Sequence, residues 1–161
     1  FICGAADDRD PAQLLSLEVT MTLNPYLHFG GNCRAAFEFY RSVFGGDFSI
    51  FETFGEAPDD MEMEVSPDEV ENVMHVSLPI GESVLMGSDV PSAYGSAVPP
   101  TSSMSISYAP SNRGEADRVF GMLSGGGTVT MPIGEMFWGS YFGACIDKFG
   151  TNWMINCESE E

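Results

Sequence analysis

The feature that most constrains the fold of this chain is an internal repeat. Seven positions recur at a constant offset of 80 residues: Asn32, Ala36, Phe39, Tyr40, Val43, Gly45 and Gly46 correspond to Asn112, Ala116, Val119, Phe120, Leu123, Gly125 and Gly126. In each copy an Asn precedes a segment with apolar residues at helical spacing, and two glycines end that segment. A looser repeat aligns Gly81–Met86 with Gly150–Ile155. A unit that occurs twice predicts two half-modules that share one core.

The hydrophobic pattern predicts the same order of elements in both copies. In the first copy we expect strands at 23–29, 48–54, 73–80 and 83–86, with a helix that runs from a cap at Asn32 to Phe44. In the second copy we expect strands at 104–108, 128–131, 138–146 and 153–157, with a helix over 112–123. The prediction is an α+β fold in which paired βαβββ modules form a cupped mixed sheet.

The domain boundaries follow from the repeat and from turn-rich stretches. One compact domain is expected, with a first module at 21–90, a Pro/Ser linker at 91–101 and a second module at 102–161. Residues 21–25 resemble a natural start, so residues 1–20 are interpreted as an N-terminal extension or an expression remnant.

The charge of the chain is strongly negative. It has 6 Lys and Arg residues against 24 Asp and Glu residues, which gives a net charge of −18 at pH 7. Such a surface repels phosphate backbones and anionic lipid headgroups, so we expect neither nucleic acid nor a membrane as a partner. A solvated acidic surface suited to a salty cytoplasm explains the charge, and an acidic face for a cationic protein partner is the alternative.

The four cysteines do not form a recognisable framework. Cys3, Cys33, Cys145 and Cys157 show neither a C-x-x-C pair nor a Cys/His cluster, which predicts reduced thiols in a cytoplasmic protein. Residues 1–20 lack the basic start and apolar core of a secretory signal, and no apolar run reaches the ~18 residues of a membrane span. Cys33 would occupy the first turn of a helix, where a thiol pKa can fall, but its place on the apolar stripe favours burial.

Two stretches of the chain resemble a known family. The segment Phe137–Asn156 (FWGSYFGACIDKFGTNWMIN) resembles the closing signature of PhnB-like proteins, and Pro25–Cys33 (PYLHFGGNC) resembles their first strand. Shorter matches occur at Phe39-Tyr40, Phe44–Gly46, Phe54–Glu56 and Met74-His75. The resemblance covers residues 22–157 and points to the glyoxalase/bleomycin-resistance/dioxygenase group, the vicinal oxygen chelate superfamily. It implies paired βαβββ modules, a homodimer with sites built across both modules and, in many relatives, a divalent metal that polarises substrate oxygens.

The metal ligands that this resemblance implies are absent from their expected positions. The resemblance implies one ligand position on the first strand and one on the last strand of each module. In the first module these positions fall on one of Asn24, Pro25 and Tyr26 and near Met86, and in the second they fall near Ser103 and on Met154. Thioether sulfur is a poor partner for hard or borderline divalent ions, so we expect no metal in the usual slots. Some relatives carry a label for a ubiquinone-pathway methyltransferase, but no G-x-G-x-x-G follows a strand here, and we discount that activity.

The two histidines of the chain are the first candidates for a site. His28 and His75 are both expected on the strand face that does not pack against a helix. Together they would supply a base near neutral pH or a two-nitrogen platform for a divalent metal. Glu52 and Glu56, at the end of the second strand and in the next turn, are the candidate catalytic carboxylates that would complete a His/His/carboxylate set. The alternative is two hydrogen-bonded histidines with no joint role, beside ordinary surface carboxylates.

Apolar side chains on the same strands are candidates for a ligand pocket. The predicted ligand-binding residues are Tyr26, His28, Phe54, His75, Met86, Trp138, Phe142 and Met154. For the apolar members the alternative is ordinary core packing. Because several of the six Lys and Arg residues fall on helix surfaces, a neutral or aromatic ligand suits the sequence better than an anion.

These observations leave two functions open. The first is a PhnB-like protein that binds a small molecule in an apolar cup without a tightly held metal. The alternative is a divalent-metal-dependent lyase or isomerase, similar to glyoxalases, with a rearranged His/Glu site. An organic ligand should stabilise the first kind of protein, whereas a chelator should inactivate the second.

Overall fold

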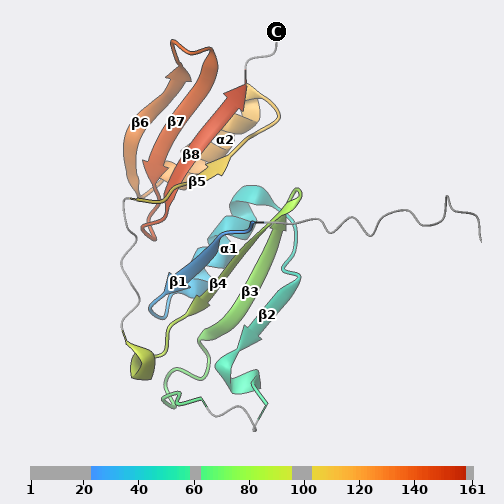
Figure 1. Cartoon of the computed structure of the whole chain (residues 1–161), viewed down its shortest axis with the longest axis vertical. Coiled ribbons are helices and arrows are strands. Elements are labelled where there is room, and N and C mark those ends of the chain that lie inside the picture. The colour runs from blue at the N-terminus through green and yellow to red at the C-terminus, as the bar shows by residue number, and fades with distance from the viewer. Residues whose placement is uncertain (1–22, 59–62, 96–102, 159–161) are drawn as a thin grey trace, which may run out of the picture.

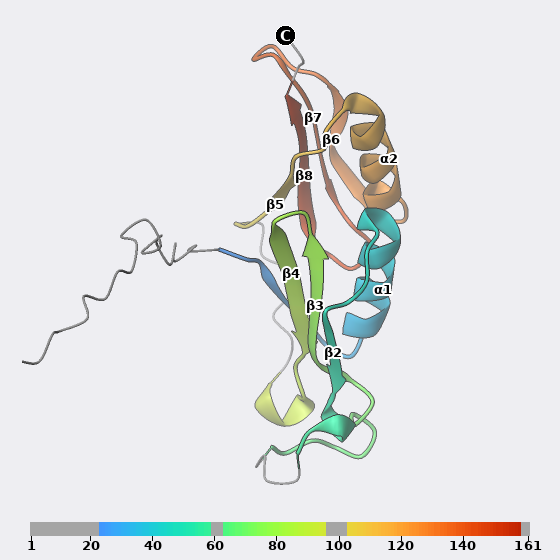
Figure 2. The same cartoon turned by 90° about the vertical axis from the view of Figure 1, so that its right-hand side faces the viewer.

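The computed structural model describes residues 23–58, 63–95 and 103–158. Within these ranges it contains two four-stranded sheets, and one helix covers the same side of each sheet (Figures 1 and 2). The expected N-terminal extension at 1–20 and most of the expected linker at 91–101 lie outside the described residues.

The two modules have the same topology. The first contains β1 (Tyr26–Phe29), α1 (Cys33–Phe44), β2 (Ile50–Thr53), β3 (Val73–Ile80) and β4 (Ser83–Asp89), with the short 3-10 helices η2 (Phe54–Glu56) and η3 (Ser92–Tyr94). The second contains β5 (Ile106–Tyr108), α2 (Arg113–Ser124), β6 (Thr128–Glu135), β7 (Ser140–Ile146) and β8 (Asn152–Glu158). The strand orders are β1-β4-β3-β2 and β5-β8-β7-β6, with one parallel pair in each sheet, β1 with β4 and β5 with β8. The predicted α+β fold of paired βαβββ modules is confirmed.

Alternation along the strands separates a buried face from an open face. On β3, Val76 and Leu78 are fully buried in the core, whereas His75 and Ser77 lie on the other side of the strand. We call the side of each sheet that is turned away from α1 and α2 its open face, and Figure 2 shows both open faces on the same side of the molecule. The open faces are therefore the surfaces on which polar groups of the strands can meet a ligand.

A buried polar junction joins the two modules. The Tyr40 hydroxyl on α1 donates to Asp147 Oδ2 at 2.9 Å, and the indole N–H of Trp153 on β8 donates to the same oxygen at 2.9 Å. Asp147 Oδ1 accepts from the backbone N–H groups of Phe149 and Thr151. The carboxylate is 3% exposed, and these four donors compensate its burial.

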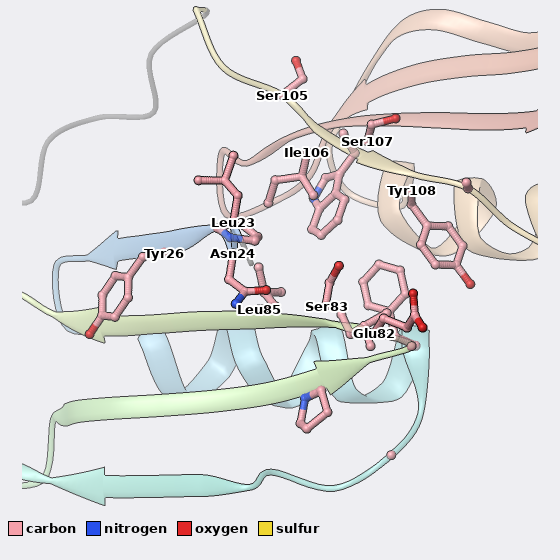
Figure 3. Close-up of a pocket in the computed structure, with 18 of the residues that line it drawn as sticks. Leu23, Asn24, Tyr26, Glu82, Ser83, Leu85, Ser105, Ile106, Ser107 and Tyr108 are labelled. Carbon is pink, nitrogen blue, oxygen red and sulfur yellow. The ribbon is translucent and has the colours of Figure 1, made fainter. Parts of the chain in front are cut away.

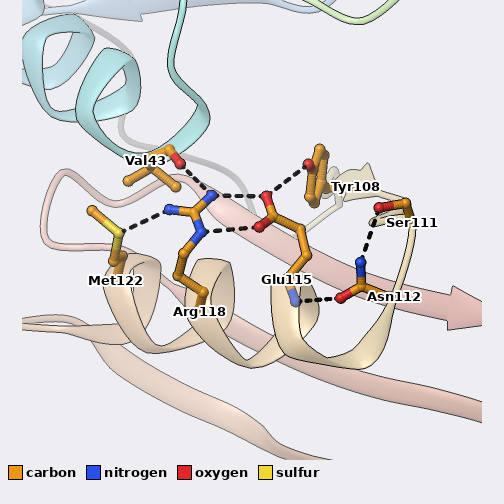
Figure 4. A network of polar contacts seen from close by, with 7 residues as sticks. All are labelled: Val43, Tyr108, Ser111, Asn112, Glu115, Arg118 and Met122. Atoms are coloured by element: carbon orange, nitrogen blue, oxygen red, sulfur yellow. Dashed lines mark hydrogen bonds and ion pairs between the residues drawn. The ribbon is translucent and has the colours of Figure 1, made fainter.

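A second network lies at the helix surfaces (Figure 4). The Arg118 guanidinium on α2 donates to the Val43 carbonyl of α1 at 2.8 Å and to both carboxylate oxygens of Glu115. The Tyr108 hydroxyl on β5 donates to Glu115 at 3.4 Å. Arg118 thus links α2 to the last turn of α1, where the Val43 carbonyl is one of the groups that the helix leaves without an internal partner.

The starts of the two helices differ, and one sequence expectation is wrong. Asn112 caps α2, because its Oδ1 accepts from the Glu115 N–H at 2.9 Å. Asn32 makes no such bond at the start of α1. There Asp89, from the end of β4, accepts from the N–H groups of Gly31 and Cys33 at 2.8 and 3.0 Å, so a residue distant in sequence replaces the local cap.

Several strand ends also differ from the sequence-based prediction. β4 continues to Asp89 rather than Met86, because its last residues pair in parallel with β1. β6 continues to Glu135 rather than 131, across register shifts on both sides of Met131. Across the described part of the chain, no helix is long and apolar enough to cross a membrane.

Candidate functional site

The open face of the first sheet brings together most of the predicted polar site residues. Cross-strand partners in the register are His28 and Ser88, Tyr26 and Met86, Met86 and Ser77, and Glu52 and His75. These pairs place side chains from four strands on one surface, because directly opposed residues share a face. We call Tyr26, His28, His75, Ser77 and Ser88 the histidine cluster.

Hydrogen bonds connect the members of the histidine cluster. The Tyr26 hydroxyl lies 3.1 Å from His75 Nδ1, and the other ring nitrogen, Nε2, lies 2.9 Å from Ser77 Oγ. Ser88 Oγ lies 3.4 Å from His28 Nδ1. The Tyr26 ring is 5.1 Å from the His28 ring and stacks on the His75 ring at 5.7 Å. The two histidines therefore meet through Tyr26.

This arrangement can move a proton. A neutral imidazole has one donor and one acceptor nitrogen, so His75 can donate to one hydroxyl while it accepts from the other. The side chains of Tyr26 and His28 are exposed, and His75 is half-buried, so a bound molecule can reach this chain of groups. The chemistry that it supports is hydrogen bonding to a carbonyl or hydroxyl, or proton exchange with it.

The two candidate carboxylates lie in different environments. Glu52 is exposed and faces His75 across the β2–β3 pair. Glu56 Oε2 accepts from the backbone N–H and the hydroxyl of Thr53, at 2.9 and 3.0 Å. These two bonds lower the pKa of the Glu56 carboxyl, which keeps it ionised and unsuited to act as an acid. Its role as a base, like that of Glu52, stays a prediction.

The donor set does not fit a divalent metal. Among residues 23–58, 63–95 and 103–158, no group of three or more His, Cys, Asp or Glu side chains is placed to hold an ion. Both ring nitrogens of His75 already contact hydroxyl oxygens, and Met86 lies between Tyr26 and Ser77 in the register. We therefore derive no chemical step that uses a metal.

The other predicted ligand-binding residues lie elsewhere. Phe54 is buried in η2. Trp138, in the connection between β6 and β7, is half-exposed, and its ring is 6.0 Å from that of Phe142 on β7. Met154 on β8 is opposed to Ser107 and Ala144. The predicted set therefore divides between the first module, which holds the polar residues with Met86 and Phe54, and the second module, which holds Trp138, Phe142 and Met154.

Burial disfavours a nucleophilic role for the described cysteines. Cys33, Cys145 and Cys157 are free and buried. Burial, with the nearby Asp89 carboxylate, raises the pKa of the Cys33 thiol. Burial and Asp147 raise the pKa of Cys145 to about 11. A protonated, buried thiol neither attacks a substrate nor binds a metal readily.

Sequence reasoning missed two members of the histidine cluster. Ser77 follows His75 by two residues on the same strand, so the period of a β-strand was a sufficient signal for it. Ser88 was missed because the predicted strand ended at Met86, three residues before its observed end at Asp89.

Comparisons with known proteins agree with this architecture. Residues 21–156 match the model of a family described as 3-demethylubiquinone-9 3-methyltransferase. The chain is 30% identical over 153 residues to Protein YjdN of Escherichia coli strain K12, which covers 88% of this chain and 98% of that protein. The crystal structure of protein PA1353 from Pseudomonas aeruginosa matches with a TM-score of 0.76 at 37% identity, over 88% of this chain and 100% of that one.

More distant structures share the fold. A PhnB protein from Bacillus cereus matches with a TM-score of 0.67 at 22% identity, over 85% of this chain and 99% of that one. A glyoxalase-related enzyme from Fulvimarina pelagi matches with a TM-score of 0.54 at 18% identity, over 87% of this chain and 89% of that one.

Proposed function

We propose a function from the premise that the chain belongs to the PhnB-like family described as 3-demethylubiquinone-9 3-methyltransferase, within the glyoxalase/bleomycin resistance/dioxygenase superfamily. The chain binds a small neutral molecule on the open face of its first sheet. The observation that carries the proposal is the hydrogen-bonded chain from Tyr26 through His75 to Ser77. The ligand is a planar or aromatic compound with at least one carbonyl or hydroxyl oxygen.

The composition of the open face supports this class of ligand. Tyr26 offers the face of an aromatic ring and is 40% exposed, and Met86 offers an adaptable apolar surface beside it. His28 and His75 offer hydrogen-bonding nitrogens, and the histidine cluster includes no Lys or Arg to attract a carboxylate or phosphate. A few convergent polar groups beside apolar contacts are typical of small-molecule sites.

A homodimer would complete the site. One sheet supplies only one wall, and large apolar side chains are exposed on both modules: Tyr26 and Ile50 in the first, and Val129, Met131, Phe137 and Trp138 in the second. We propose that the β6–β7 region of a second copy covers the histidine cluster, so that Trp138 and Phe142 form the apolar wall of the cup. The rings of Phe137, Trp138 and Phe142 lie next to one another, and grouped apolar side chains of this kind mark surfaces that bind another chain.

The test of the proposed function is a fragment screen by protein-observed NMR. Aromatic carbonyl and phenol fragments should shift the ring signals of His28 and His75 in the wild type. The Tyr26→Phe variant, which keeps the ring and loses the hydroxyl bound to His75, should bind the same fragments about tenfold more weakly. Fragments that shift only signals remote from the first sheet would refute the site.

A metal titration distinguishes the alternative enzyme. The alternative, a metal site made by the two histidines and Glu52, would start from the cross-strand pairing of Glu52 with His75. Calorimetry with Zn²⁺, Ni²⁺ and Mn²⁺ should show no stoichiometric binding to the wild type. Stoichiometric binding that is lost in the double variant His28→Ala/His75→Ala would replace our proposal with a metal-dependent lyase or isomerase.

A further inference from the structure

The two modules form a groove beside the proposed site, and Tyr26 is the one member of the histidine cluster that also lines it. It lies between the start of β1 and the β3–β4 turn on one side and β5 on the other, and its volume is about 1080 Å³ (Figure 3). We call it the junction groove. Both modules supply its walls, so it depends on how they pack against each other.

Aromatic rings line the deep part of the junction groove. The Phe44 ring, at the end of α1, is 5.1 Å from the Tyr108 ring of β5 and 5.4 Å from the buried Trp153 ring of β8. Leu85 of β4, which is buried, and Ile106 of β5 add to this apolar surface (Figure 3). Such a lining stabilises a flat or branched hydrocarbon group that leaves water.

The mouth of the junction groove exposes further apolar side chains. Leu23 is 98% exposed and Met104 is 70% exposed, and both belong to the lining. Large apolar residues grouped at a concave site are more informative than single ones scattered over a surface, because they mark a place where another molecule binds.

The charge on the described lining of the junction groove is negative. Of the described residues that line the groove, Glu82 is the only charged one, and no Lys, Arg or His is among them. Glu82 is exposed in the turn that follows Gly81, and Figure 3 shows Glu82 and Ser83 facing Ile106 and Tyr108 across the opening. An anion would meet this carboxylate without a compensating cation, whereas a positive charge would pair with it. Aromatic faces such as those of Phe44 and Tyr108 also attract cations.

We infer that the junction groove binds a hydrophobic organic cation. The apolar body lies against Phe44, Leu85 and Ile106, and the ammonium group lies at the mouth beside Glu82. The volume suits a drug-sized molecule. The inference rests on Glu82 and on the aromatic rings at the base, none of which belongs to the histidine cluster, so it does not depend on the proposed site on the open face, although Tyr26 lines both.

A matched set of probes tests the inference. Calorimetric titrations would use 1-naphthylmethylamine, 1-naphthylmethanol and 1-naphthylacetate, which share a ring system and differ in charge. The wild type should bind the amine most tightly, the alcohol more weakly and the acetate least. Glu82→Gln should weaken binding of the amine about fivefold and leave the alcohol unchanged. Glu71→Gln, the same change of charge at an exposed residue outside the groove lining, is the control and should leave all three affinities unchanged.

A blocking variant locates the bound probes. Ser107 is exposed on β5 and lines the groove, so Ser107→Trp should fill the space and abolish binding of both the amine and the alcohol. An unchanged melting temperature would show that the variant is folded. Equal affinity for all three probes, an amine affinity that falls equally in Glu82→Gln and Glu71→Gln, or full binding by folded Ser107→Trp would each overturn the inference.

Discussion

The hydroxyl group of Tyr40 in the first module donates a hydrogen bond to the carboxylate of Asp147 in the second, at 2.9 Å, and both side chains are buried. The two residues are 107 positions apart in the sequence. This bond joins the two modules and helps to compensate the burial of the Asp147 charge. The modules should therefore unfold together.

Removing that hydroxyl should destabilise the whole chain. Tyr40→Phe keeps the ring contacts with Phe37 and Trp153 but takes one donor from Asp147. A hydrogen bond to a buried charged group contributes about 1.5–3 kcal/mol, and we expect a loss of that size in the free energy of unfolding by urea. Tyr141→Phe is the matched control, because its hydroxyl bonds to Asp117 at an exposed position. A control loss equal to that of Tyr40→Phe would contradict this explanation.

Removing the Asp89 carboxylate should destabilise the first module. Its Oδ1 accepts from the N–H groups of Gly31 and Cys33, and its Oδ2 accepts from that of Val73 at 2.9 Å. Asp89→Ala would leave three backbone donors without this acceptor, which should cost about 3 kcal/mol or more. Hydrogen exchange at these three amides should accelerate more than exchange in β7 and β8. The exposed Asp47→Ala is the control, and similar rates in both variants would refute the role of Asp89.

Two glycines should respond in opposite directions to the same substitution. A Cβ atom at Gly87 would lie 2.5 Å from Cε2 of the buried Phe37 ring, so Gly87→Ala should destabilise the protein by about 1–3 kcal/mol. At Gly121, on the exposed side of α2, a Cβ atom would meet nothing within 4 Å. Gly121→Ala should therefore stabilise the protein by about 0.5–1 kcal/mol. Thermal unfolding of both variants would check the signs, and a shared sign would show that the packing differs from the structure.

The raised pKa of the buried Cys145 thiol predicts that the folded protein loses stability at alkaline pH. Because burial raises the pKa of Cys145 from 9.0 to about 11, the folded state holds its proton more tightly than the unfolded state. The resulting stabilisation is complete below pH 9 and is lost as the pH rises toward 11. Urea unfolding should show a steeper loss over this interval for the wild type than for Cys145→Ala. Iodoacetamide at pH 8 should modify Cys33 and Cys145 only when the protein is unfolded, and rapid modification of the folded protein would contradict their burial.

Much of the fold could be predicted because its signals are local. The period of the apolar residues and the glycine pairs fixed both helices to within a residue, and β3 was predicted with its observed bounds. Where the ends differ, distant contacts decide. β4 reaches Asp89 because it pairs with β1, and Asp89 then accepts from the amides of Gly31 and Cys33 at the start of α1, where Asn32 makes no side-chain cap bond.

The candidate site could be predicted only within one sheet. Alternation placed His28 and His75 on the open face, and the register then brought Tyr26 and Met86 beside them. The junction groove had no comparable signal. Phe44 and Tyr108 meet only because the modules pack against each other, and neither the period nor the spacing of residues within one module encodes that packing.

The two ways of starting a helix have a consequence for the order of events during synthesis and folding. Asn112 lies next to α2 in the chain, so the second helix has its cap as soon as its own first turn exists. The acceptor for the first turn of α1 is Asp89, 56 residues beyond Cys33. The first helix therefore cannot complete its N-terminus until β4 has left the ribosome and paired with β1. Although the modules repeat one pattern, the helix of the module synthesised first gains its N-terminal acceptor only after the last strand of that module has formed.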